Sequence, residues 1–282
     1  MVVSRVDCHA HVIEPLRFPY ADGPGYKPRP NEIGDWDAYR SVLTSCGVSH
    51  GVLVQPSCYG TDNACMLEAM ARSQGRLKGI AVVRPQSTEG ELRALEEKGV
   101  VGVRLHLMRS DPTALTRPDA AGFLARVKAL GWFVEVYATG DVWSGVTPIL
   151  RRSGARVLIA HLGEPDPSRD LSQAGFQAVL ALGRETDAVI KLSAPFRTTA
   201  VGSPYLDVDR FVGAVVDSFG LDRCVWGSDW PFIDTPHRVE YGDLLSCLTR
   251  WLPDPDHRDR VLRRNPARLF GFVNNTGWPV SP

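Results

Sequence analysis

The sequence lacks a long apolar run and an excess of either charge. A membrane-spanning helix needs about 18 or more consecutive apolar residues, so we expect no membrane segment. Lys plus Arg and Asp plus Glu number 32 each, a balance that favours neither a nucleic-acid nor an acidic-membrane partner. The N-terminal stretch MVVSRVDCHA has no charged head followed by a long apolar segment, so we expect no signal peptide and a cytoplasmic protein.

The sequence also lacks any CxxC pair. Its six cysteines are scattered, and in a chain of 282 residues without a secretion signal we expect them to be reduced thiols rather than zinc ligands or disulfides: Cys8, Cys46, Cys58, Cys65, Cys224 and Cys247. Hydrophobic residues make up 44% and charged residues 23%, which is typical of a soluble globular protein with a substantial core.

Short apolar runs rich in Val, Ile and Leu recur along the chain. Continuous apolar runs, rather than alternating ones, indicate parallel strands buried on both faces. Eight such runs are present, at residues 5–12, 51–57, 77–83, 100–107, 133–138, 156–162, 188–193 and 223–229.

Amphipathic segments separate these runs, and several of them end in Gly, as helices often do. Thr88 and Glu91 have the spacing of a capping box at the start of one such helix. Eight strand–helix units in about 280 residues predict a (β/α)₈ barrel of the TIM type, with an extra C-terminal helix and residues 1–282 as a single domain. The alternative, a doubly wound sheet, needs a Gly-rich phosphate turn after the first strand, and DCHAHVIEP is not one. The Pro/Gly-rich residues 18–30 are interpreted as a loop at the active-site face.

Polar residues collect where the predicted strands end, which is where barrel enzymes place their active sites. His9 and His11 face the same way because strand side chains alternate. Other candidates at these ends are Gln55, Ser57, Tyr59, Arg104, His106, Arg109, Glu135, Tyr137, His161, Lys191, Ser193, Arg197 and Asp229.

The stretches that carry a family resemblance are DCHAHV, VQPSCYGTDN, GVRLHLMR, GWFVEVYATG, VLIAHLGEPD, KLSAPFR, WGSDWPF and NPARLFGF. In this order, from residue 5 to about residue 272, they resemble the amidohydrolase superfamily. The similarity is greater to the branch with 2-pyrone-4,6-dicarboxylate lactonase, sulfomuconolactone hydrolases and sugar lactonases. It implies a hydrolase acting on a small lactone, with a role in aromatic compound catabolism.

Many members of this superfamily hold divalent metals, and the resemblance predicts the ligands His9, His11, His161 and Asp229 if zinc or another metal is bound. Two departures argue against a required metal. Tyr137 stands where metal-binding members have a strand 5 histidine, and a phenol with an ordinary pKa of about 10 is a poor ligand at neutral pH. The strand 4 run VVGVRLHL contains no lysine. We therefore favour a metal-independent enzyme, with His106 as a stand-in ligand only if it faces the mouth.

Lactone hydrolysis needs a base for water, a group that polarises the carbonyl, and anchors for the substrate. We assign Asp229 as the base, which returns its proton to the leaving oxygen, and His161 as the carbonyl partner. His9 and His11 add donors or orient Asp229. Substrate-binding candidates are Arg104, Arg109 and Arg197, whose planar guanidinium groups suit carboxylates, together with Tyr137, Ser57 and Tyr59.

At one position the residue differs from that of the dicarboxylate lactonase. There the third residue after the strand 6 histidine is an arginine that helps to bind a carboxylate, whereas here it is Glu164. We therefore expect a lactone with a single anionic group, or a neutral sugar-like lactone.

Two alternatives remain. One is a metal-dependent decarboxylase or amide hydrolase of the same superfamily, and the other is a non-catalytic ligand-binding barrel. The sequence leaves the specific lactone and the oligomeric state open.

Overall fold

Eight parallel strands form one sheet in which the strands follow each other in sequence order. The computed structural model describes residues 3–23, 25–108, 113–235 and 237–272. The strands are β1 (Val6–Ala10), β2 (His50–Val54), β3 (Leu77–Ala81), β4 (Val100–His106), β5 (Phe133–Tyr137), β6 (Arg156–Ile159), β7 (Val189–Ser193) and β8 (Cys224–Gly227). The expected (β/α)₈ barrel is confirmed, and the doubly wound alternative is excluded because the strand order shows no reversal.

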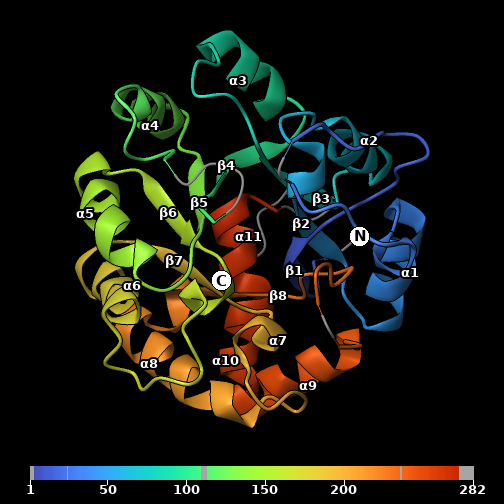
Figure 1. Cartoon of the computed structure of the whole chain (residues 1–282). Coiled ribbons are helices and arrows are strands. Elements are labelled where there is room, and N and C mark those ends of the chain that lie inside the picture. Colours follow the sequence, from blue (N-terminus) through green and yellow to red (C-terminus); the bar gives the residue numbers. More distant parts are fainter. Residues whose placement is uncertain (1–2, 24, 109–112, 236, 273–282) are drawn as a thin grey trace.

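Helices surround the sheet, as the view down the barrel shows (Figure 1). They are α1 (Trp36–Ser45), α2 (Ala64–Arg72), α3 (Glu89–Glu96), α4 (Ala120–Ala129), α5 (Val142–Ser153), α6 (Ala174–Glu185), α7 (Pro195–Thr198), α8 (Asp209–Phe219), α9 (Tyr241–Trp251), α10 (Pro255–Asp259) and α11 (Asn265–Phe270). The predicted capping box is present, since Thr88 Oγ1 accepts a bond from the Glu91 amide and the Glu91 carboxylate accepts one from the Thr88 amide. None of the described helices is long and apolar enough to cross a membrane.

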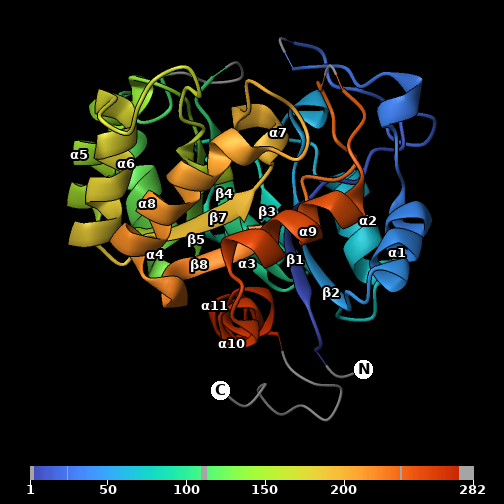
Figure 2. The same ribbon diagram turned by 90° about the horizontal axis from the view of Figure 1, so that it is seen from below.

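The two ends of the barrel differ. Figure 2 shows α10 and α11 below the end where the strands begin, and α7 at the opposite end. Phe270 of α11 and the following Phe272 are buried in one cluster with Val6, Val52 and Leu158 from the strands. The C-terminal helix therefore closes the bottom of the barrel, which leaves the carboxyl ends of the strands as the open end.

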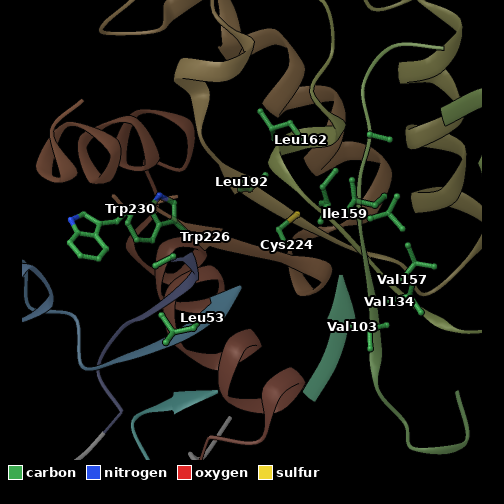
Figure 3. Packing of buried hydrophobic residues seen from close by; sticks show 14 of the residues in the cluster. Leu53, Val103, Val134, Val157, Ile159, Leu162, Leu192, Cys224, Trp226 and Trp230 are labelled. Atoms are coloured by element: carbon green, nitrogen blue, oxygen red, sulfur yellow. The ribbon is translucent and has the colours of Figure 1, made fainter. Parts of the chain in front are cut away.

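Alternate strand residues face outward and pack under the helices. Five residues from five different strands belong to this outer layer and are labelled in Figure 3: Leu53, Val103, Val134, Ile159 and Leu192. Because each strand is buried on both faces, it reads as a continuous apolar run in the sequence. Polar residues within such a run are therefore exceptions, and they occur toward the open end.

A bulge interrupts β1 between Asp7 and Ala10. Cys8 packs in the inner cluster, and His9, its neighbour, also reaches the interior residues Glu135 and Lys191. Asp7 instead contacts Tyr39 of α1, on the outer side. A bulge re-aims side chains in this way because it inserts one residue into the strand. His9 is thereby directed into the barrel interior, beneath the open end.

β8 returns to β1 and nearly closes the barrel. The amide of Asp229 donates to the carbonyl of His9, and the amide of His11 donates to the carbonyl of Trp230, each at 2.7 Å. The Asp7 carboxylate reinforces this seam, accepting bonds from the Ser228 amide at 2.8 Å and the Ser228 hydroxyl at 2.6 Å. The seam sets the histidines of β1 opposite Asp229.

The sequence overestimates the length of several strands. β6 ends at Ile159 and β8 at Gly227, so His161 and Asp229 lie just beyond their strands rather than at the strand ends as predicted. The reason is backbone conformation, because His161 (φ 49°) and Asp229 (φ 65°) lie in the left-handed region, which strand pairing does not allow.

The seam predicts a strict size limit at Gly227. A Cβ at this position would lie 2.7 Å from the Cβ of His9 and 2.8 Å from its amide nitrogen. We expect Gly227→Ala to lower the free energy of unfolding by about 1–3 kcal/mol, the usual cost of overpacking. Urea denaturation measures this change. Gly213→Ala is the matched control, since a Cβ there meets no atom within 4 Å. Gly213 is an exposed residue of helix α8, where alanine adds about 0.5–1 kcal/mol of stability. Equal effects of the two changes would contradict this interpretation.

Candidate active site

The carboxylate of Asp229 is the centre of the site. Its Oδ1 lies 3.2 Å from His11 Nε2, 3.5 Å from His9 Nε2 and 3.9 Å from His161 Nε2. Its Oδ2 accepts a 2.7 Å bond from Arg197 Nε. The structure thus brings together the four predicted residues from β1, β6 and β8, and all four are buried.

The charges around Asp229 determine its protonation. Burial alone would raise the pKa of this carboxyl group, but the Arg197 guanidinium and the neighbouring histidines outweigh burial and hold the pKa well below its usual range. Asp229 is therefore held as a carboxylate at neutral pH.

A tight turn after β6 positions two further side chains. Four successive residues, from His161 to Glu164, have positive φ values. Trp143 fixes this turn, since its Nε1 donates to the carbonyls of Ala138 and Gly163 at 2.9 and 2.8 Å. Left-handed backbone is costly for residues other than glycine and collects at functional sites. The turn directs both His161 and Glu164 into the same cavity.

Burial favours the neutral form of His9 and of His161. Burial is the main cause that lowers the pKa of His9 and of His161 well below the usual value, and the nearby cations Lys191 and Arg104 lower both pKa values further. His161 Nδ1 lies 2.9 Å from Ser193 Oγ on β7. If the hydroxyl donates this bond, His161 directs an Nε2–H toward the cavity.

A cavity of about 220 Å³ opens above Asp229. Its walls include the predicted residues His11, Ser57, Arg104, Tyr137, His161, Arg197 and Asp229, and also His106, Glu164, Tyr26, Met108, Thr139, Ile233 and Asp234. Tyr26 comes from the loop at residues 18–30, which the sequence analysis expected at this face. The contributions of Tyr26, Ile233 and Asp234 were missed because loop residues carry no periodic signal.

The predicted anchors divide into three groups. Arg197 also donates to the Ile233 carbonyl at 2.9 Å, and Arg104 to the Gln55 carbonyl at 3.1 Å, so both guanidinium groups are held at the cavity wall. The prediction that Tyr59 lines the pocket is wrong. Its hydroxyl accepts a 2.8 Å bond from the Glu14 amide, and it packs against Tyr20 behind the wall. Arg109 lies outside the described residues.

Glu164 and Tyr137 form a pair in the cavity wall. Burial raises the pKa of the Glu164 carboxyl group, although Arg197 and the Tyr137 hydroxyl act in the opposite direction. Burial and the neighbouring Glu164 also raise the pKa of Tyr137. One carboxyl oxygen, Glu164 Oε2, is buried and has no hydrogen-bond partner among the described residues. The Glu164 side chain therefore has a free polar atom for a ligand.

A buried ion pair lies beneath the site. Lys191 of β7 contacts the Glu135 carboxylate of β5, and its Nζ is 3.1 Å from His9 Nδ1. Arg104 Nε is 3.5 Å from Glu135 Oε1. The sequence analysis noted these positions but gave Glu135 and Lys191 no role. The sequence could have indicated this ion pair, because a charged residue inside an apolar buried strand needs a partner of opposite charge.

A metal site was tested against the geometry of the ligand atoms. His9, His11 and Asp229 each offer one ligand atom within 4.8 Å of the others. His11 is suitable, because its Nδ1 faces the Val54 carbonyl at 2.7 Å and leaves Nε2 as the ligand atom. His9 is not, because its Nδ1 faces the Lys191 ammonium, which can only donate. His9 then holds its proton on Nε2, where a metal needs a lone pair. His106 packs on Tyr137 and is not in this group of ligand atoms. The residues do not fit a resident divalent cation.

Comparison with known proteins agrees with the barrel and its open end. A family model described as amidohydrolase matches residues 6–272. A 4-sulfomuconolactone hydrolase of Rhizobium radiobacter is 32% identical over 95% of this chain and 90% of its own length. A 2-pyrone-4,6-dicarboxylate hydrolase of Comamonas testosteroni is 30% identical over 98% and 90%. The crystal structure of a probable 2-pyrone-4,6-dicarboxylic acid hydrolase from Acinetobacter baumannii, with citric acid bound, superimposes with a TM-score of 0.86 at 33% identity, covering 95% of this chain and 99% of that one.

The neutral histidines predict a pH-dependent stability. When the chain is unfolded, His9 and His161 take up protons near pH 6.5, but burial lowers both pKa values in the folded state. The unfolded chain thus binds more protons below about pH 6.5, and stability that is present at pH 7 is lost as the pH falls. Each histidine contributes at most about 1.4 kcal/mol per pH unit.

Urea denaturation between about pH 7 and pH 5 measures this slope. We expect His161→Gln, which keeps a polar group beside Ser193, to show a shallower slope than the wild-type chain by up to about 1 kcal/mol per pH unit. Identical slopes for the two proteins would mean that His161 is not held neutral by the fold.

Proposed function

The chain belongs to the amidohydrolase family, and we propose that it hydrolyses the ester bond of a small lactone that carries one anionic group. The observation that carries this proposal is the Asp229 carboxylate beside His161, in a small cavity that also holds Arg104 and Arg197. Relatives that are 30–32% identical over nearly their whole length are named as lactone hydrolases, which supports the reaction class.

Asp229 acts as the base toward water. It is ionised before substrate arrives, as a base must be, but its depressed pKa makes it a weak base in the free protein. A substrate anion that binds Arg197 shares the guanidinium charge and weakens its hold on Asp229. The pKa of Asp229 then rises, so the base becomes stronger when substrate is present. On ring opening the proton passes from Asp229 to the leaving ring oxygen.

His161 polarises the lactone carbonyl. With the Ser193 hydroxyl donating to Nδ1, the imidazole offers Nε2–H to the oxygen on which negative charge develops. His11 Nδ1 lies 2.7 Å from the Val54 carbonyl, and His11 Nε2 lies 3.2 Å from Asp229 Oδ1, so the ring packs against the carboxylate and limits its movement. His9 lies below the cavity and contacts Asp229 rather than substrate. Of its two predicted roles, the geometry favours orientation of Asp229.

The cavity limits the substrate in size and charge. At about 220 Å³ it is smaller than the usual range of about 300–1,000 Å³ for ligand pockets, which favours a compact ring. Arg104 and Arg197 attract an anion. Glu164, with its raised pKa and unpartnered oxygen, suits a hydroxyl or carbonyl group of the substrate and disfavours a second carboxylate. A monoanionic lactone satisfies all three features.

We propose that no metal takes part. The protonated Nε2 of His9 and the Tyr137 phenol remove two ligands that metal-dependent members use, so carbonyl polarisation falls to His161. A metal-dependent decarboxylase or amide hydrolase is the competing function, because the ligand atoms of His9, His11 and Asp229 lie within 4.8 Å of one another. Such an enzyme would release carbon dioxide or an amine and would lose activity with a chelator.

The decisive experiment is a lactone panel assayed by the acid released on ring opening, with and without chelator. We expect turnover that a chelator leaves unchanged, and a kcat reduced at least about 10²-fold in Asp229→Asn, because an amide cannot accept the proton. Asp234→Asn is the matched control, an acid at the same cavity that should change kcat less than about threefold. Asp229→Asn with wild-type turnover would refute the mechanism, and binding without turnover of any lactone would favour the non-catalytic barrel.

Glu164 predicts a change of specificity. We expect Glu164→Arg to raise the ratio of kcat/KM for a dicarboxylate lactone over a monoanionic one by at least about tenfold, roughly 1.4 kcal/mol, because a cation replaces a carboxyl group. Glu164→Gln is the control and should change the ratio much less, since it keeps the size of the side chain and introduces no cation. A large loss of kcat for all lactones in both variants would instead indicate a catalytic role.

A further inference from the structure

Lys191 is a fully buried cation in the centre of the barrel. Its ammonium contacts the Glu135 carboxylate and lies 3.1 Å from His9 Nδ1. Lys191 is not among the residues that line the cavity above Asp229, so it does not touch a substrate bound there. A role for this lysine must therefore act through His9.

The contact with Lys191 determines which nitrogen of His9 holds the proton. An ammonium group carries three N–H donors and no acceptor, so His9 Nδ1 can meet it only with a lone pair. The single proton of the neutral ring then stands on Nε2. This nitrogen is buried, has no hydrogen-bond partner among the described residues and lies 3.5 Å from Asp229 Oδ1. An N–H dipole thus lies near the carboxylate, without a hydrogen bond between the two groups.

We propose that Lys191 is a positioning residue that holds His9 in its Nε2–H tautomer, which orients the Asp229 carboxylate and denies a divalent cation the lone pair it would need. The same contact therefore serves two purposes. It places the positive end of an N–H dipole near the candidate base. It also prevents His9, His11 and Asp229 from binding a divalent cation together.

The surroundings of Lys191 show what its removal would do. Glu135 Oε1 lies 3.9 Å from His9 Nδ1 and has no hydrogen-bond partner among the described residues. Without the ammonium, this carboxylate is the nearest group of opposite polarity, and His9 would donate Nδ1–H to it. A carboxylate behind a histidine is the usual arrangement at zinc sites. His9 Nε2 would then present a lone pair beside His11 Nε2 and Asp229.

The inference concerns the same site as the proposed function but does not require a lactone as substrate. The tautomer and the bound metal are both measured without turnover. A failure of the lactone assay and a failure of the Lys191 proposal are therefore separate results.

The first test is ¹⁵N NMR of the histidine side chains in the full wild-type chain, with the His9 signals assigned from His9→Asn. We expect His9 to be neutral, with a protonated Nε2 and an unprotonated Nδ1. A proton on Nδ1 would overturn the proposal. Because this measurement uses the wild-type protein, it decides the matter even if a variant of the buried lysine fails to fold.

The second test removes the ammonium with Lys191→Met, which keeps the length of the side chain. Lys78→Met is the matched control, since Lys78 is the half-buried lysine of β3 and lies away from the site. We expect the His9 proton to move to Nδ1 in Lys191→Met only. Each protein is then mixed with one equivalent of zinc and passed through gel filtration. We expect Lys191→Met to retain about one zinc per chain. The wild-type chain and Lys78→Met should each retain less than about a tenth of that amount.

A His9→Asn change in the Lys191→Met background should abolish this zinc binding, which assigns the metal to His9. With the best lactone substrate, Lys191→Met should reduce kcat by about 10–100-fold and change KM much less, as expected for a residue that acts through a neighbour. Stoichiometric zinc on the wild-type chain, or no gain of zinc in Lys191→Met, would overturn the exclusion of metal by Lys191.

Discussion

The Asp7 carboxylate at the seam between the first and last strands is the contact on which the site depends. It is fully buried and accepts five hydrogen bonds, from the His9 amide, the Ser228 amide and hydroxyl, and the Tyr39 and Tyr241 hydroxyls. These donors come from β1, the end of β8, α1 and α9. Burial raises the pKa of Asp7, and the bonds oppose that shift. By joining β1 to the end of β8, Asp7 brings His9 and His11 within reach of Asp229.

The buried charges affect the protonation of neighbouring site residues more than they affect the stability of the fold. Removing two charges from water costs energy that their attraction only partly returns, so a buried ion pair is weak evidence of stabilisation. The Glu135–Lys191 pair and the Arg197–Asp229 pair both adjoin the histidines, and each biases a neighbouring group. Lys191 selects a tautomer in His9, whereas Arg197 sets the basicity of Asp229. The positions of both ion pairs beside the histidines support a role in the chemistry of the site rather than in stability.

Backbone strain is concentrated at the open end of the barrel. His161, Glu164 and Asp229 all have positive φ values, a conformation that costs side chains other than glycine of order 1 kcal/mol each. The rigid sheet below and the Trp143 bonds to the turn hold these residues in place. Strained residues on a rigid support are preorganised, which is what stabilisation of a developing charge requires.

The sequence by itself determined the barrel and most of the site. Hydrophobic runs of strand length are a local property, and they located all eight strands; the ends of those runs located His9, His11, His161 and Asp229. It did not determine the strand ends, the burial of Tyr59 or the partners of Lys191. His9 and Lys191 are 182 positions apart, and their contact depends on the bulge in β1 and on closure of the barrel. Only the tertiary structure decided which nitrogen of His9 meets a cation, because that is set by distances across the barrel rather than by spacing along the chain.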